Sequence, residues 1–121
     1  MTRIALVVSD VDGTLLTSDK TLTKSAQAAV AELRARDIGF TIISSRPPRG
    51  LGMLLVPLRL ATPFAALNGG IIAAPDLSII AEHHIPGRIA RRAIARIAFP
   101  DKEHLRIVPV ADDRPISSQN R

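Results

Sequence analysis

Short apolar runs recur along the first seventy residues of the chain, separated by longer polar segments. The β-branched runs at residues 4–8 and 38–43 predict two buried strands, and "FAAL" at residues 64–67 predicts a third. Each run is short and is followed by residues typical of turns, as expected for strands in the interior of a sheet.

The segments between these strands carry the signals of two helices. Thr23 is a suitable N-cap for a helix through about Arg36, and Asp37 is expected to end it in a left-handed conformation. Residues 47–48 are both proline, which suits the first turn of a second helix ending near Pro57. The order strand, helix, strand, helix, strand is typical of a parallel α/β sheet.

The pattern changes after the third predicted strand. Residues 70–86 predict a hairpin with Pro75 and Asp76 in its turn. A helix over residues 88–98 and a strand over residues 104–110 follow, and the last residues form no obvious element.

Composition narrows the class of protein. The 121 residues are 46% hydrophobic and 22% charged, which indicates a folded globular chain. No apolar run approaches the roughly 18 to 20 residues that span a bilayer, and the N-terminus lacks a signal-peptide pattern, so no membrane partner is expected. The absence of cysteine excludes disulfides and thiolate metal sites, and a cytoplasmic location is the simplest interpretation.

The net charge of +5 raises the question of nucleic-acid binding. The clearest basic cluster is Arg88, Arg91, Arg92 and Arg96, which lie opposite an apolar stripe on the last predicted helix. A solvated helix face is favoured over an anion-binding role there. Aromatic residues make up only 2% of the chain, so stacking platforms are scarce and no nucleic-acid partner is expected.

Polar residues follow each of the three predicted strands. Asp10 and Asp12 follow the first, Ser44 and Arg46 end the second, and Asn68 ends the third. Two adjacent carboxylates can bind a metal, act as an acid and base, or form a solvated turn. Ligands of open α/β sheets bind beyond the carboxyl ends of the strands, so this shared position favours a functional site.

These residues resemble the motifs of the haloacid dehalogenase superfamily. "DVDGT" at residues 10–14 matches the first motif, Asp-x-Asp-Gly-Thr after an apolar strand. The layout is similar to the Cof-type branch, with "SSR" at residues 44–46 where that branch has Thr-Gly-Arg, and "NGG" at residues 68–70 where it has Asn-Gly-Ala. The resemblance implies an α/β, Rossmannoid core over residues 1–80, with a parallel three-stranded half-sheet flanked by helices, and part of an α+β cap over residues 81–121.

The resemblance also implies the chemistry of the aspartates. Asp10 would be the nucleophile that attacks a phosphoryl group, giving an aspartyl-phosphate, and its carboxylate would bind Mg²⁺. Asp12 would protonate the leaving oxygen and then activate water, and its backbone carbonyl would contact the metal. The substrate class is small phosphorylated molecules.

Five further residues take binding roles by the same resemblance. Thr14 would order the loop, and Ser44 would hydrogen-bond the phosphoryl oxygens. Asn68 and Gly69, with Arg46, would lie at the substrate entrance. The residues themselves leave open whether Arg46 only caps a helix or pairs with a carboxylate.

Two parts of the family pattern have no match. The family places a lysine on a later strand, whereas this chain has only Lys20, Lys24 and Lys102, none in that place. Asp112 and Asp113 lack the preceding Gly-Asp pattern and are interpreted as a solvated turn. His83, His84 and His104 are interpreted as surface or cap residues, the adjacent pair pointing to opposite faces of a strand.

The sequence is therefore interpreted as stopping inside the cap, which has two consequences. The first is that the chain would be an incomplete Cof-type Mg²⁺-dependent phosphohydrolase and therefore weak or inactive. The second is an exposed edge at residues 4–8, which predicts a homo-oligomer that covers it. The alternatives are a non-catalytic binding remnant of the same fold, or a phosphatase of the mannosyl-phosphoglycerate or sucrose-phosphate type.

Overall fold

The computed structural model describes residues 3–97. The strand predicted at residues 104–110, and Lys102, His104, Asp112 and Asp113, lie outside the described residues. The chain divides into two compact units at the boundary between His84 and Ile85, and each is described by itself.

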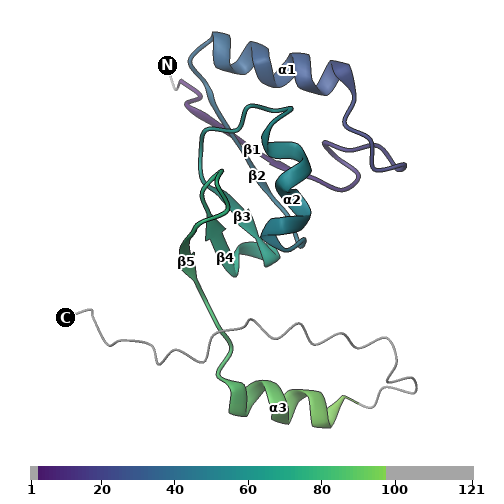
Figure 1. Cartoon of the computed structure of the whole chain (residues 1–121), viewed down its shortest axis with the longest axis vertical. Coiled ribbons are helices and arrows are strands. Elements are labelled where there is room, and N and C mark those ends of the chain that lie inside the picture. The colour runs from purple at the N-terminus through teal and green to yellow at the C-terminus, as the bar shows by residue number, and fades with distance from the viewer. Residues whose placement is uncertain (1–2, 98–121) are drawn as a thin grey trace, which may run out of the picture. The chain divides into compact units, whose positions relative to one another are not determined.

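A mixed five-stranded sheet forms the centre of the first unit, in the order β1-β2-β3-β4-β5 (Figure 1). Its first three strands are β1 (Leu6–Asp10), β2 (Gly39–Ile43) and β3 (Phe64–Ala66), and both neighbouring pairs are parallel. The predicted parallel half-sheet is thus confirmed.

Two strands extend this sheet in the opposite sense. β4 (Ile71–Ala73) runs antiparallel to β3, and β5 (Ile79–Glu82) runs antiparallel to β4. The predicted hairpin is correct, and Asp76 closes its turn by accepting hydrogen bonds from the backbone and hydroxyl of Ser78. His83 and His84 follow the end of β5 at Glu82 and are both exposed, as expected for surface residues.

Helix α1 (Lys24–Ala35) begins and ends where the sequence predicts. The Thr23 hydroxyl accepts a hydrogen bond from the Ala26 N–H at 3.1 Å, which satisfies one of the unpaired donors of the first turn. At the other end, Asp37 has φ of +58° and lies in the left-handed region. The guanidinium of Arg34 donates to the carbonyl oxygens of Leu58 and Arg59, joining α1 to the segment after the second helix.

We expect Thr23→Ala to lower the free energy of unfolding by about 1 kcal/mol, because alanine leaves the Ala26 N–H without its cap. The measurement is urea unfolding followed by far-ultraviolet circular dichroism. Ser18→Ala removes an exposed hydroxyl of the neighbouring loop and serves as the control. A loss below roughly 0.3 kcal/mol for Thr23→Ala would contradict a stabilising cap.

Helix α2 (Pro48–Leu55) supplies much of the core. Pro48 occupies the first helical turn, as predicted, and Leu51 and Leu54 are fully buried. Both leucines belong to one buried cluster, whose side chains come from the strands, α1, α2 and the connecting loops. The cluster consists of Val11, Leu16, Val30, Ile42, Leu51, Leu54, Leu55, Leu58, Leu60, Phe64, Ala66, Ile71 and Ala73.

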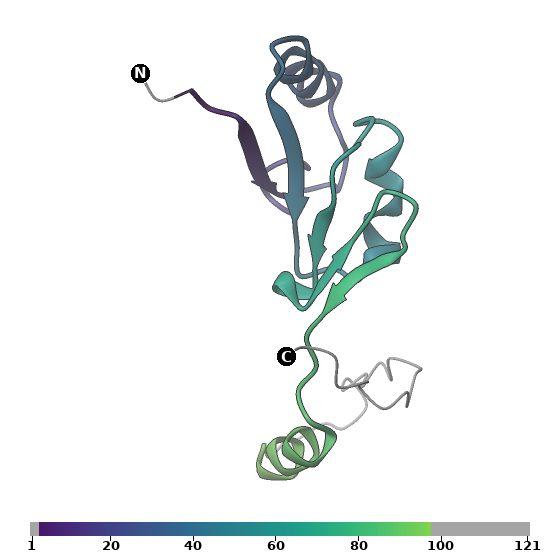
Figure 2. The ribbon, with the colours of Figure 1, turned by 90° about the vertical axis from the view of Figure 1, so that its left-hand side faces the viewer.

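Among the described residues of the first unit, helices cover one face of the sheet. Figure 2 shows α1 and α2 together on the far side of the strands, with β1 at the edge. On the near face Leu6, Val8 and Ile43 are 51%, 55% and 39% exposed. The prediction of a buried first strand is therefore wrong, and the strand also starts two residues later than predicted. Within residues 3–97, β1 pairs with β2 alone, and association through the other edge of β1 stays a prediction.

The described part of the second unit contains helix α3 (Gly87–Arg96). In this helix the arginines lie on one face, and Ile89, Ala93 and Ile94 lie on the other, as predicted from their spacing. Within residues 3–97, no helix is long and apolar enough to cross a membrane.

Candidate functional site

The first motif forms a tight turn directly after β1. Val11 is fully buried, and its carbonyl accepts hydrogen bonds from the N–H groups of Leu15 and Leu16 at 3.0 and 2.9 Å. Gly13 has φ of +79°, a conformation that costs glycine little. Burial of Val11 anchors the turn and leaves the two flanking aspartates outside the core.

The Thr14 hydroxyl donates to Asp10 Oδ2 at 3.3 Å. This contact crosses the turn and ties the last residue of β1 to the loop that follows. It is consistent with the expectation that Thr14 orders the loop.

Strands β2 and β3 bring further groups to the same edge. Ser44 follows β2 and is only 4% exposed, and its hydroxyl accepts from the Arg46 N–H at 3.1 Å. The Asn68 N–H donates to the Ser44 carbonyl at 3.0 Å, and the Leu67 N–H donates to the Arg46 carbonyl at 3.0 Å. These backbone bonds hold the end of β3 against the end of β2.

Arg46 makes the principal side-chain contact between the end of β2 and the turn after β1. Its Nε donates to Asp12 Oδ2 at 2.8 Å and its Nη2 donates to Asp12 Oδ1 at 2.6 Å. Such a two-pronged pair is strong and directional, because the planar guanidinium matches the geometry of a carboxylate. The sequence left open whether Arg46 caps a helix or pairs with a carboxylate, and the structure has the ion pair together with a bond from Nη1 to the Gly50 carbonyl of α2 at 3.3 Å.

A second cation reaches the same carboxylate. Lys20 Nζ lies 2.8 Å from Asp12 Oδ1, although the residue belongs to the loop between β1 and α1. Sequence reasoning missed this residue, because it sought a lysine on a later strand. The available signal was the turn sequence "TSDKT" between Leu16 and Leu22, which folds back toward the motif.

These contacts lower the pKa of Asp12 to about 2. The hydrogen bond from Arg46 is the largest cause, and the one from Lys20 is the next. The same pairing raises the pKa of Arg46 above its ordinary value. At neutral pH Asp12 is therefore a carboxylate held by two cations.

The lowered pKa of Asp12 predicts a pH-dependent contribution to stability. A depressed folded-state pKa stabilises the fold above the unfolded-state value near 3.8, and this gain is lost as pH falls toward 2. We expect the melting temperature of Asp12→Asn to lie below that of the wild type at pH 6, with the difference shrinking below pH 4. Arg46→Gln should remove the larger share of this pH-dependent part, since Lys20 still pairs with Asp12, and a difference that stays constant down to pH 2 would contradict the pairing.

Other predicted residues make fewer contacts. Asn68 and Gly69 lie in a short 3₁₀ turn, with φ of +55° and +88°. Among the described residues, neither Asn68 nor Gly69 forms a hydrogen bond with Asp10 or Asp12, and the Asn68 N–H donates to the Ser44 carbonyl. Their place at a substrate entrance stays a prediction.

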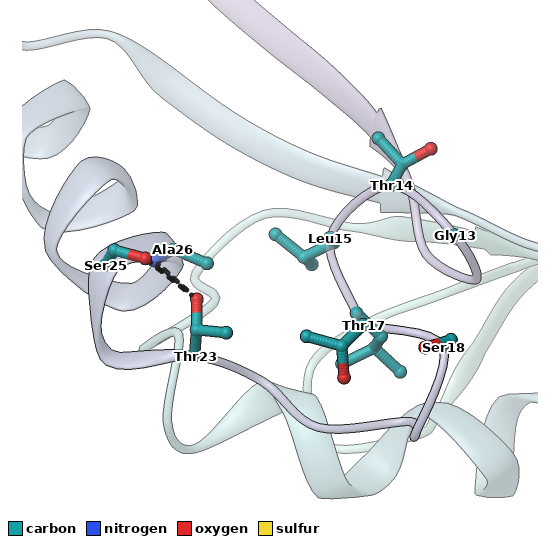
Figure 3. Close-up of a pocket in the computed structure, with 9 residues that line it drawn as sticks. Gly13, Thr14, Leu15, Thr17, Ser18, Thr23, Ser25 and Ala26 are labelled. Atoms are coloured by element: carbon teal, nitrogen blue, oxygen red, sulfur yellow. Dashed lines mark hydrogen bonds between the residues drawn. The ribbon is translucent and has the colours of Figure 1, made fainter.

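An open groove of about 700 Å³ lies beside the motif rather than on its carboxylates (Figure 3). It runs between the loop after β1 and the first turn of α1, where Figure 3 shows the Thr23 cap on Ala26. Five of the nine residues that line it carry a hydroxyl group. The lining consists of Gly13, Thr14, Leu15, Leu16, Thr17, Ser18, Thr23, Ser25 and Ala26.

The donors at the strand ends suit a hard cation in part. Within residues 3–97 no three His, Cys, Asp or Glu side chains come together as a ready metal site. Asp10 and Asp12 nevertheless offer oxygen donors, and Mg²⁺ commonly uses one or two carboxylates together with waters and substrate phosphate. The chemistry of this donor set fits Mg²⁺ shared with a phosphorylated ligand better than Mg²⁺ bound by protein alone.

The fold and the motif define a class of protein. The chain belongs to the haloacid dehalogenase-like hydrolase family, whose sequence pattern matches residues 7–118. This confirms the resemblance and, with it, the α/β class of the fold.

Solved structures share this fold. A haloacid dehalogenase-like hydrolase from Bacillus subtilis superposes with a TM-score of 0.68 at 22% identity, over 76% of this chain and 32% of that chain. The phosphatase BT1666 from Bacteroides thetaiotaomicron gives a TM-score of 0.67 at 26% identity, over 76% of this chain and 34% of that chain.

Curated relatives are named as phosphatases. A protein of Streptococcus pyogenes serotype M6 with that name is 38% identical over 72 residues, which is 57% of this chain and 27% of the relative. The 5-amino-6-(5-phospho-D-ribitylamino)uracil phosphatase YitU of Bacillus subtilis is 31% identical over 75 residues, which is 62% of this chain and 28% of the relative. The matched segment thus spans little more than a quarter of the length of these relatives.

Proposed function

We propose that the chain carries the nucleophile and the acid/base of a Mg²⁺-dependent phosphate-monoester hydrolase. The observation that supports this most is the position of "DVDGT" at the end of β1, with Asp12 bound to Arg46 from the end of β2. Relatives named as phosphatases agree with the reaction class. The proposed substrates are small phosphorylated molecules.

In the proposed reaction, Asp10 supplies the attacking oxygen. One carboxylate oxygen forms a bond to phosphorus while the bond from phosphorus to the leaving oxygen breaks, giving an aspartyl-phosphate. The Thr14 hydroxyl, at 3.3 Å from Asp10 Oδ2, restricts rotation of this carboxylate. The buried Ser44 hydroxyl lies beside the Arg46 N–H and suits a hydrogen bond to a phosphoryl oxygen.

Asp12 moves the protons. As an acid it gives a proton to the leaving oxygen, and as a base it takes a proton from the water that attacks the aspartyl-phosphate, releasing phosphate and restoring Asp10. Its low pKa suits the second role at neutral pH and opposes the first. The first role therefore requires the contacts from Arg46 and Lys20 to loosen when substrate binds.

Mg²⁺ would be held by the Asp10 carboxylate and the Asp12 backbone carbonyl, and would offset the repulsion between an anionic nucleophile and a phosphoryl group. The chain has no lysine on the later strands described, and its late aspartates lack the Gly-Asp pattern. Losing a charge-stabilising group in phosphoryl transfer costs orders of magnitude in rate, so we expect weak turnover.

The experiment that tests this function is phosphate release from an aryl phosphate, with and without Mg²⁺. The function is supported by a metal-dependent rate, however small, that is lost in Asp10→Asn. A rate that Asp10→Asn leaves unchanged contradicts it.

A non-catalytic binding protein of the same fold is the second candidate, favoured by the absence of a lysine from the later strands within residues 3–97. It predicts a rise in melting temperature on adding Mg²⁺ and phosphate, with no phosphate release. The sugar phosphatases specialised for mannosyl-phosphoglycerate or sucrose phosphate are tested by supplying those two substrates in the same assay.

A further inference from the structure

A small hairpin, residues 16–22, follows the first motif and carries Lys20. Leu16 and Leu22 pair as an antiparallel bridge, and the Lys20 N–H donates to the Thr17 carbonyl at 2.9 Å. The Thr17 N–H in turn donates to the Thr21 carbonyl at 3.1 Å. This arrangement is a turn closed by one residue in the left-handed conformation, and that residue is Lys20, with φ of +59°.

A lysine is an unfavourable choice for this position in the backbone. Glycine or asparagine adopts the left-handed conformation more readily, because a longer side chain crowds the following carbonyl. The ion pair from Lys20 to Asp12 is a weak structural reason for the lysine, because the Lys20 side chain is 60% exposed and exposed ion pairs add little to folding. Arg59, Leu67 and Leu77 share this conformation, so what distinguishes Lys20 is its ammonium beside Asp12 rather than its backbone.

Two positive charges converge on the Asp12 carboxylate, one from Arg46 and one from Lys20. The Lys20 ammonium has three N–H donors, and within residues 3–97 its one hydrogen-bond acceptor is Asp12. Donors thus remain on the ammonium for another anion beside Asp12.

We propose that Lys20 is a phosphoryl-binding residue, and that with Arg46 it forms a cationic pair which holds the substrate phosphoryl group beside Asp12. The inference rests on the proposed function, because it places that group next to the residue that transfers the proton. Lys20 supplies from the hairpin a positive charge of the kind that the family takes from a later strand.

An incoming phosphoryl group would share the two cations with Asp12. As the ammonium turns donors toward the incoming anion, its contact with Asp12 weakens, which is the loosening that the acid role of Asp12 requires. This gives the loop after β1 a direct part in substrate affinity, in addition to its part in forming the turn.

The test is calorimetric titration of inorganic phosphate into the whole chain at fixed ionic strength, with and without Mg²⁺. We expect Lys20→Gly and Lys20→Asn to weaken phosphate binding about tenfold or more in both conditions, since each removes a charge-assisted hydrogen bond. Without phosphate, the melting temperature of Lys20→Gly should equal or exceed that of the wild type, because glycine relieves the left-handed backbone. If Lys20 had a purely structural role, Lys20→Gly would lower the melting temperature and leave phosphate affinity unchanged.

Two variants complete the test. Lys24→Gln removes the same charge from the exposed first turn of α1 and should leave phosphate affinity unchanged, whereas Lys20→Arg should retain it. Wild-type affinity in Lys20→Gly, or no phosphate binding by the wild type, would overturn the inference. Phosphate binding that depends on Lys20 without any turnover would leave the inference standing and remove the proposed function instead.

Discussion

Replacing Asp10 by asparagine is expected to abolish covalent phosphorylation of the chain. Asparagine has nearly the same shape and can still accept the hydrogen bond from Thr14, but its amide is not a nucleophile toward phosphorus. After incubation with an aryl phosphate and Mg²⁺ and quenching in acid, intact-mass spectrometry should find an added phosphoryl group on the wild type. We expect the modified fraction to fall by at least ~10²-fold in Asp10→Asn.

This measurement detects the chemistry even where turnover is slow, because a chain that forms the aspartyl-phosphate but hydrolyses it poorly accumulates the intermediate. Asp19→Asn changes an exposed carboxylate of the nearby hairpin and should be phosphorylated as the wild type is. Phosphorylation that persists in Asp10→Asn would identify another nucleophile and remove Asp10 from its proposed role.

Replacing Phe64 by alanine is expected to cost about 3–5 kcal/mol of unfolding free energy, among the largest effects of any single truncation in the core. Phe64 is 1% exposed at the start of β3, where it packs within the cluster built on α2. An ordinary domain is stable by only roughly 5–15 kcal/mol, so the variant should be partly or wholly unfolded at 37 °C. Thermal unfolding followed by circular dichroism measures the change.

Val56→Ala is the matched control, because Val56 follows α2 directly but is 82% exposed. It should change the unfolding free energy by less than about 0.5 kcal/mol. If Phe64→Ala lost less than about 1 kcal/mol, the buried cluster would not carry the stability assigned to it.

The site combines a rigid part with a part that has to rearrange. Backbone bonds among Ser44, Arg46 and Asn68 hold two strand ends together, and these do not depend on charge. The contacts of Asp12 with Arg46 and Lys20 are electrostatic and lie near the surface, so an anionic ligand can compete for them. In the proposed reaction, substrate binding and the protonation of Asp12 would therefore be coupled through the same two cations.

The sequence predicts the elements of the first unit well because local signals determine them. Thr23 caps α1, Asp37 ends it, and Pro48 starts α2, each through a conformational preference of its own backbone or side chain. The expected burial of the first strand fails for a different reason. An apolar β-branched run fits a strand with either one or two covered faces, and here helices cover only one.

By itself, the sequence determined the parallel half-sheet, the turn that presents Asp10 and Asp12, and the family to which their motif belongs. Periodicity, capping and a contiguous motif are local properties that can be read without coordinates. Only the tertiary structure decided that Arg46 and Lys20 converge on Asp12. Arg46 lies 34 positions after Asp12 along the chain, and the turn around Lys20 is a local feature whose sequence does not say that the ammonium reaches Asp12. Such contacts depend on which strand ends lie side by side, and that is settled by packing over the whole sheet.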